Sequence, residues 1–184
     1  MTNNDDEKIL QTTTLAGGCF WCIESAFNSV KGIVSAKSGY MGGQSTEPSY
    51  KEVCTGQSGH AEVVQLVFDA DSISYRDIME IFFSLHNPTQ LNRQGHDIGS
   101  QYRSEIFTHN QQQHDIAVAI IAEMTQAQLF DEPIVTRINP VETFYCGEDY
   151  HQEYFKNNPE NQYCQAVVSP KLAKFRQTFV AKLK

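Results

Sequence analysis

The order of the periodic apolar segments constrains the fold of this chain most. Alternating and helical hydrophobic patterns follow one another as strand, helix, strand, strand, helix and strand, the order of a split βαβ layout. We therefore expect one α+β domain, a two-layer sandwich with a ferredoxin-like βαββαβ core, a mainly antiparallel sheet and a C-terminal extension. The expected elements are strands at 10–16, 33–40, 61–69, 102–107 and 134–138, and helices at 20–30, 74–86, 110–130 and from 169.

Residues 61–69 give the clearest strand pattern, with polar residues only at positions 62 and 65 before Asp69. In the strand at 33–40, alternation places Val34, Ala36, Ser38 and Tyr40 on one side. The polar stretches between these segments predict loops.

Length and charge limit the class of protein. The chain has 184 residues, 40% hydrophobic content and a net charge of −8. This suits a single domain and argues against a nucleic-acid surface, which needs a basic footprint. We expect a flexible arm at 1–8, a catalytic domain at 9–157 and a C-terminal extension at 158–184 that carries a basic helix.

The chain shows neither a secretion signal at its start nor an apolar run long enough to span a bilayer. Its five cysteines are an odd number in a chain of ordinary size, unlike a disulfide-stapled secreted domain. These features indicate a protein of the reducing cytoplasm without nucleic-acid or membrane partners, and we expect a monomer.

Residues 15–24 place Cys19 after an apolar strand and two glycines, where a helix is expected to begin. Backbone N–H groups and the helix dipole favour a thiolate at such a position. A small buried cysteine on a strand-to-helix turn is an equally good reading.

Cys19 and Cys22 form a CxxC motif, which favours thiol–disulfide exchange and also fits half of a zinc site. Zinc requires a second, closely spaced ligand pair, and Cys146 and Cys164 lie too far apart in the sequence to supply one. We expect no bound metal, and a metal-binding or thiol-based redox sensor is the alternative class of function.

Glu62 lies on the strand face that also carries Val64, Leu66 and Phe68. Desolvation there would raise the pKa of its carboxyl and let it act as a general acid near neutral pH. The opposing possibility is that this strand end reaches solvent and Glu62 is an ordinary surface residue. A second polar group of interest is the loop at 95–104, whose Asp97 and Tyr102 can contribute to a site or only to a turn.

Five segments together resemble peptide methionine sulfoxide reductase of the A type. They occur in the order found in that family and span about 15–165; the stretches are Gly17-Gly18-Cys19-Phe20-Trp21, Gly39-Tyr40-Met41-Gly42-Gly43, Gly59-His60-Ala61-Glu62, His96-Asp97-Ile98-Gly99-Ser100-Gln101-Tyr102-Arg103-Ser104 and Phe144-Tyr145 with Glu148-Asp149-Tyr150-His151-Gln152. The chain departs from the usual pattern at Cys146, where Ala is common, and at Ala70, where Pro is common.

The resemblance implies an enzyme that reduces methionine S-sulfoxide, free or in proteins, as a repair activity. Cys19 matches the nucleophile that becomes a sulfenic acid, and Glu62 matches the acid that protonates the sulfoxide oxygen. Phe20 and Trp21 match the apolar pocket for the substrate methyl group. The remaining matches are to groups that hold the oxygen or an ordered water; they are Tyr40, Asp97 and Tyr102.

The sulfenic acid must then be removed by a second thiol. Cys164 resembles the resolving cysteine of the family, and other members use a cysteine at the position of Cys22. We expect Cys164 as the first partner of Cys19, with Cys22 as an alternative or a relay. The resemblance further implies thioredoxin as the reductant of the final disulfide, dithiothreitol as its substitute in vitro, and no bound cofactor.

Overall fold

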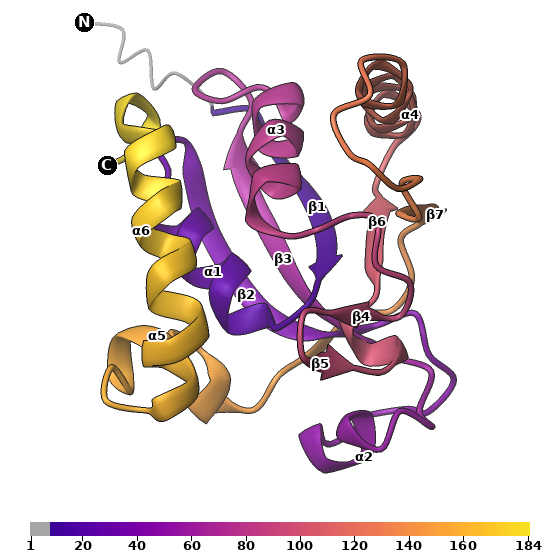
Figure 1. The fold of residues 1–184 in the computed structure, drawn as a ribbon, viewed down its shortest axis with the longest axis vertical. Coiled ribbons are helices and arrows are strands. Elements are labelled where there is room, and N and C mark those ends of the chain that lie inside the picture. Colours follow the sequence, from indigo (N-terminus) through magenta and orange to yellow (C-terminus); the bar gives the residue numbers. More distant parts are fainter. Residues whose placement is uncertain (1–7) are drawn as a thin grey trace, which may run out of the picture.

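A six-stranded sheet forms the centre of the molecule (Figure 1), with strand order β7-β6-β1-β3-β2-β8. The computed structural model describes residues 8–184. The expected arm at 1–8 therefore lies almost wholly outside the described residues. The strands are β1 (Leu10–Gly17), β2 (Ile33–Met41), β3 (Ala61–Asp69), β6 (Ser104–Thr108), β7 (Arg137–Pro140) and β8 (Tyr145–Cys146).

The sheet is mixed, within the α+β class expected from the sequence. β3 pairs antiparallel with β1 and β2, and β6 and β8 extend the sheet by antiparallel pairing with β1 and β2. β7 then pairs parallel with β6. A separate hairpin is formed by β4 (Arg93–Gln94) and β5 (Asp97–Ile98).

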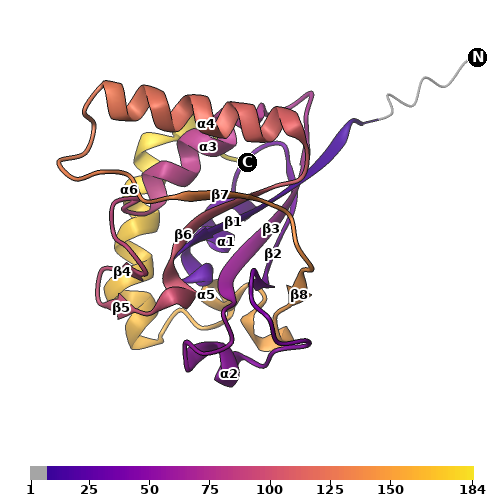
Figure 2. The same cartoon turned by 90° about the vertical axis from the view of Figure 1, so that its right-hand side faces the viewer.

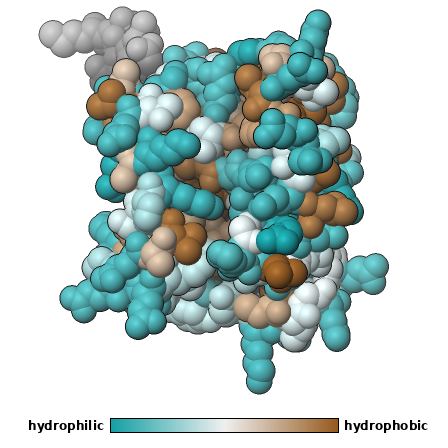
Figure 3. Space-filling view, viewed as in Figure 1, coloured by the Kyte–Doolittle hydropathy of each residue, from teal (hydrophilic) through white to brown (hydrophobic). Residues whose placement is uncertain are grey.

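Helices α1 (Phe20–Asn28), α3 (Tyr75–Leu85) and α6 (Ser169–Thr178) contact one another and cover one face of the sheet (Figures 1 and 2). Helix α4 (Gln111–Gln126) packs against α3, β6 and β7. Two short helices, α2 (Tyr50–Cys54) and α5 (Tyr154–Asn157), lie in the connecting segments. The main core fills the space between the sheet and α1, α3 and α6, and its largest buried side chains include Phe20, Phe27, Leu66, Phe68, Ile78 and Phe82. Seen from the same side as Figure 1, the surface carries apolar side chains in small groups among hydrophilic ones (Figure 3).

Several expected elements differ in detail from the structure. Val34 is exposed because a bulge between Ile33 and Ser35 shifts the register of β2, so the expected alternation fails at its start. Tyr102 ends a 3₁₀ turn, Ser100–Tyr102, and β6 begins only at Ser104. Helix α4 ends at Gln126, before the expected 130, and Gln128 has left-handed backbone, with φ of 51°.

Helix α2 and strand β8 were not expected from the sequence, and β7 begins at Arg137 instead of Ile134. A sequence signal for α2 exists, because Ser49 and Glu52 form a complete capping box.

The C-terminal segment is helical before the expected start at Ser169-Pro170. A π-helical turn, Cys164–Val168, leads directly into α6. A proline lacks the N–H of a regular helix and its ring crowds the preceding turn, so the wider π turn accommodates Pro170. This segment contributes four buried side chains to the main core: Cys164, Val168, Leu172 and Phe175.

No helix within residues 8–184 is long and apolar enough to cross a membrane.

Candidate active site

A tight turn between β1 and α1 presents Cys19. Gly18 has φ of 90°, and a Cβ atom there would lie 2.7 Å from Cγ of Gln94, so the turn requires glycine. Cys19 is the N-cap residue of α1, with non-helical φ of −58° and ψ of 122°. The expected placement of the thiol at a helix N-terminus is therefore present.

The Cys19 side chain lines a cavity of about 240 Å³. The cavity walls come from β3, α1, α2, the β4/β5 hairpin, the 3₁₀ turn and the C-terminal segment; the other lining residues are Trp21, Tyr50, Glu62, Asp97, Tyr102, Asn161 and Tyr163. Four residues far apart in the sequence and expected to form the site, Cys19, Glu62, Asp97 and Tyr102, thus meet around one space.

Burial raises the pKa of the Cys19 thiol well above its ordinary value. A hydrogen bond with Cys22 and the nearby Glu62 carboxyl raise it further, and the contact with the Trp21 backbone N–H lowers it. At rest Cys19 is consequently a neutral thiol, which differs from the thiolate that the helix terminus alone predicts.

Glu62 is buried, with an exposed fraction of 2%, so the possibility of an ordinary surface residue at a strand end is ruled out. Its Oε1 accepts a hydrogen bond from the Phe20 backbone N–H at 3.3 Å. Its Oε2 is buried and has no partner within residues 8–184. Burial raises the pKa of this carboxyl to about 8, so it carries a proton at neutral pH.

Phe20 and Trp21 occupy different positions at the site. Phe20 is buried in the core below the cavity, and the Trp21 indole forms part of the cavity wall. The indole stacks on Tyr154 with a ring-centroid distance of 3.8 Å and an interplanar angle of 9°, and it meets Tyr163 edge-on at 5.9 Å. These contacts hold the indole as one apolar side of the cavity.

Asp97 is held at the cavity by a residue that the sequence did not single out. Its Oδ2 accepts a hydrogen bond from the Tyr163 hydroxyl at 2.5 Å. Burial raises the pKa of the Tyr163 and Tyr102 hydroxyls, so both remain protonated donors over the physiological range. The cavity therefore offers a carboxylate and two phenols close to the thiol.

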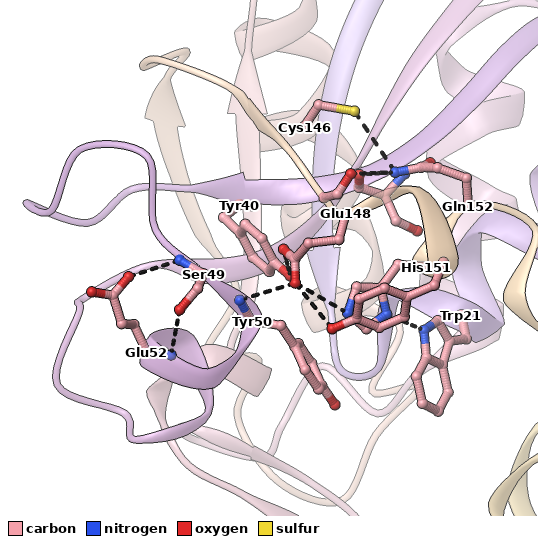
Figure 4. Close-up of polar contacts among 12 residues, drawn as sticks. Trp21, Tyr40, Ser49, Tyr50, Glu52, Cys146, Glu148, His151 and Gln152 are labelled. Carbon is pink, nitrogen blue, oxygen red and sulfur yellow. Dashed lines mark hydrogen bonds and ion pairs between the residues drawn. The ribbon is translucent and has the colours of Figure 1, made fainter.

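Tyr40 lies behind the cavity wall, fully buried, with its ring centroid 5.8 Å from that of Phe20. Its hydroxyl donates to Glu148 Oε1 at 3.0 Å (Figure 4), and burial raises the pKa of this hydroxyl. The structure does not place Tyr40 among the residues that line the cavity; Tyr50 occupies that part of the wall.

A polar cluster around Glu148 supports this wall (Figure 4). Glu148 Oε2 accepts hydrogen bonds from the Tyr50 backbone N–H at 3.2 Å and from the Tyr150 hydroxyl at 3.0 Å. Next to it, the buried His151 accepts a hydrogen bond at Nδ1 from Trp21 Nε1 at 3.1 Å. Glu148 and His151 belong to a segment that carries the sequence resemblance, although no role was assigned to them, and nothing in the sequence pattern alone singled out Asn161 or Tyr163.

The five cysteines are all free. Cys22 is buried, and a hydrogen bond with the Cys19 thiol lowers the pKa of its thiol. Burial raises the pKa of the Cys164 thiol, and the nearby Cys22 raises it further. Cys54 and Cys146 are exposed. Within residues 8–184 no three His, Cys, Asp or Glu side chains gather in a way that could hold a metal ion.

The family model of peptide methionine sulfoxide reductase matches residues 11–183. The chain belongs to this family. A methionine sulfoxide reductase of Polynucleobacter asymbioticus is 51% identical over 92% of this chain and 90% of its own length, and one of Saccharolobus solfataricus is 49% identical over 95% of this chain and 98% of its own length.

Solved structures of the family agree with the fold. The reduced form of Mxr1 from Saccharomyces cerevisiae has a TM-score of 0.78 and 36% identity, covering 87% of this chain and 91% of its own. The same yeast reductase has also been solved in complex with Trx2, with a TM-score of 0.55 and 26% identity, covering 84% of this chain and 90% of its own.

Proposed function

We propose that this chain repairs oxidised proteins by reducing methionine S-sulfoxide, free or protein-bound, in the cavity between Cys19 and Glu62. Its membership of the methionine sulfoxide reductase family makes it an oxidoreductase. The observation that carries the residue assignment is the unpartnered, protonated carboxyl of Glu62 at the same cavity as the Cys19 thiol.

In the first step the Cys19 sulfur attacks the sulfoxide sulfur while Glu62 gives its proton to the sulfoxide oxygen. Protonation is needed because a bare sulfoxide oxygen is a poor leaving group. The attack forms an S–S bond and leaves a hydroxyl on the substrate sulfur. The hydroxyl then passes to the Cys19 sulfur as the substrate S–O bond and the new S–S bond both break, so methionine leaves and Cys19 becomes a sulfenic acid. The proton of the Cys19 thiol replaces the one that Glu62 gave, so the carboxyl is again protonated.

The surrounding groups hold the substrate. Trp21, with Phe20 beneath it, grips the methyl group, and Asp97 and Tyr102 hold the sulfoxide oxygen or an ordered water. Tyr40 holds Glu148 from behind the cavity wall, and Glu148 in turn binds the backbone N–H of Tyr50. A chiral sulfur held at three points gives selectivity for one epimer.

A relay then removes the sulfenic acid. The Cys22 thiol attacks the Cys19 sulfur and releases water, and Cys164 exchanges into the Cys19–Cys22 disulfide to give a Cys22–Cys164 disulfide and a free Cys19 thiol. The sequence favoured direct capture by Cys164, with Cys22 as an alternative or a relay. The placement of Cys22 next to Cys19 supports the relay instead. Because Cys19 lies at the N-cap, outside the regular helix, the Cys22 thiol can face it.

Reduction of the last disulfide uses the dithiol of thioredoxin, which is supported by the Trx2 complex of the yeast relative. We also propose a monomeric, cytoplasmic enzyme without a bound cofactor and without nucleic-acid or membrane partners. Its catalytic unit is 9–157, and 158–184 closes the site. The inner strand order β6-β1-β3-β2 supports a ferredoxin-like core.

The proposal is tested by single-turnover reduction of methionine S-sulfoxide, followed by peptide mapping of the disulfide formed. Cys19→Ser is expected to abolish reduction, and full activity in that variant would disprove the function. In Cys164→Ser a Cys19–Cys22 disulfide is expected to accumulate, whereas a persistent sulfenic acid on Cys19 would disprove the relay.

A further inference from the structure

Glu24 is a buried carboxyl that the proposed reaction does not use. It lies on α1, one turn after Phe20 and Trp21, with an exposed fraction of 1%. Its Oε2 accepts a hydrogen bond from the Glu153 backbone N–H at 2.9 Å, and its Oε1 is buried without a partner within residues 8–184. Burying a carboxyl is costly, so its presence in the core calls for a role.

Glu24 holds a strained point of the backbone. Glu153 has φ of 53° and ψ of 36°, the left-handed conformation, which is unfavourable for a non-glycine residue. Such strain persists only where the surroundings hold it. Gln152 supplies the second hold, since its side-chain amide accepts from the Ser38 N–H at 3.1 Å and donates to the Ser38 carbonyl at 2.9 Å.

Gln152 and Glu153 directly follow His151, whose imidazole contacts Trp21. The indole N–H can only donate, so Nδ1 of His151 is the acceptor and its proton lies on Nε2. Burial lowers the pKa of His151, which keeps the imidazole neutral and the acceptor available. Glu24 of α1 therefore binds the backbone of Glu153, and His151 of the same segment binds the indole of Trp21, which lies one turn before Glu24 on α1.

We infer that Glu24 is a positioning residue: by binding the Glu153 N–H it sets the backbone that places His151 against Trp21 and so fixes the indole. The consequence for substrate binding rests on the proposed role of Trp21 in the methyl pocket. Glu24 itself touches neither the cavity nor the reacting atoms.

Two variants of similar size separate positioning from general stability. Glu24→Gln keeps an oxygen that accepts from the Glu153 N–H, and Glu24→Leu removes the acceptor. Both remove the buried charge, so both are expected to fold. Ser25→Ala, at the neighbouring position of α1, is the control.

Trp21 is the only tryptophan of the chain, so the intrinsic fluorescence of the full-length protein reports on its indole directly. We expect a long-wavelength shift of the emission and easier quenching by acrylamide in Glu24→Leu, with wild-type spectra in Glu24→Gln and Ser25→Ala. Unchanged emission in Glu24→Leu, or an equal change in Glu24→Gln, would overturn the positioning role.

The substrate consequence is measured separately as the KM for methionine S-sulfoxide, expected to rise about fivefold in Glu24→Leu with kcat within about twofold. A shifted emission with an unchanged KM would support positioning by Glu24 and would contradict the methyl-pocket role of Trp21. The two claims can therefore fail independently.

Discussion

Glu62 and Glu24 are two buried carboxyls on the core side of the sheet, and they differ in what their free oxygen faces. Each accepts one backbone N–H, each has one oxygen without a partner in the described chain, and burial raises the pKa of both, to about 8 and about 7. Only Glu62 lines the cavity that holds the Cys19 thiol. The comparison teaches that a raised pKa marks burial, and that access to a reacting atom marks a catalytic acid.

The largest expected effect separates the two carboxyls by rate. Glu62→Gln should slow single-turnover sulfoxide reduction by about 10²–10⁴-fold, the usual contribution of a general acid, while Glu24→Gln stays within about twofold of wild type. Stopped-flow or quenched-flow measurement gives the rate, and titration of the Cys19 thiol should show a lower pKa in Glu62→Gln but not in Glu24→Gln, because the Glu62 carboxyl helps to raise that pKa. Comparable losses of rate in both variants would mean that Glu62 and Glu24 do not differ in their catalytic role.

The position of the acid is tested by shortening it. Glu62→Asp keeps a carboxyl but withdraws it by one methylene, and a displacement of about 1 Å at a reacting group costs on the order of 10²-fold in rate. We expect a single-turnover rate between those of wild type and Glu62→Gln. A wild-type rate in Glu62→Asp would mean that proton transfer does not depend on placement.

The pH dependence of the first step tests which carboxyl gives the proton. Glu62 supplies a proton only while it is protonated, so the single-turnover rate should fall about tenfold per pH unit once the pH exceeds the Glu62 pKa of about 8. Glu24→Gln should leave this limb in place. Loss of this fall in rate in Glu24→Gln would show that Glu24, and not Glu62, gives the proton.

Replacing either carboxyl by Gln should change the free energy of unfolding in the same direction. In the case of Glu24 the replacement should have little effect on the rate of sulfoxide reduction. Because the folded pKa of each exceeds its unfolded value, the stabilisation is complete below about pH 4.3 and is lost as pH rises through about 7 for Glu24 and about 8 for Glu62. Each Gln variant should therefore gain on the order of 2–4 kcal/mol in unfolding free energy over wild type between pH 5 and pH 9. Urea unfolding under reducing conditions measures this, and parallel curves for all three proteins would contradict it.

Local patterns predicted the parts of the fold that depend on local chemistry. The hydrophobic alternation of β3 correctly placed Glu62 on the core face, and α4 begins where the expected helix at 110–130 starts, with Asn110 as its N-cap. One failure arose where tertiary contacts decide, because the bulge that exposes Val34 depends on pairing with β3. The helical turn before Pro170 was missed because the proline was expected to start the helix, whereas a π turn leads into it.

The candidate site could be predicted as far as its chemistry is carried by residue type and spacing. Cys19, Glu62, Asp97 and Tyr102 do meet at one cavity. Tyr163 and Tyr50 were missed because a lone tyrosine has no distinctive spacing, and Tyr40 was expected to face the substrate although its hydroxyl bonds to Glu148. The neutral state of Cys19 also escaped prediction, since burial by distant segments outweighs the local helix terminus.

Infrared difference spectroscopy of the carboxyl C=O stretch tests the central claim most directly, namely that Glu62 stands protonated beside the Cys19 thiol at neutral pH. In a Glu24→Gln background, which removes a second buried carboxyl whose pKa is raised, subtraction of the Glu24→Gln/Glu62→Gln double variant isolates the signal of Glu62. We predict a protonated-acid band at pH 7 that disappears with a midpoint near pH 8. A carboxylate signal from Glu62 already present at pH 6 would contradict the account.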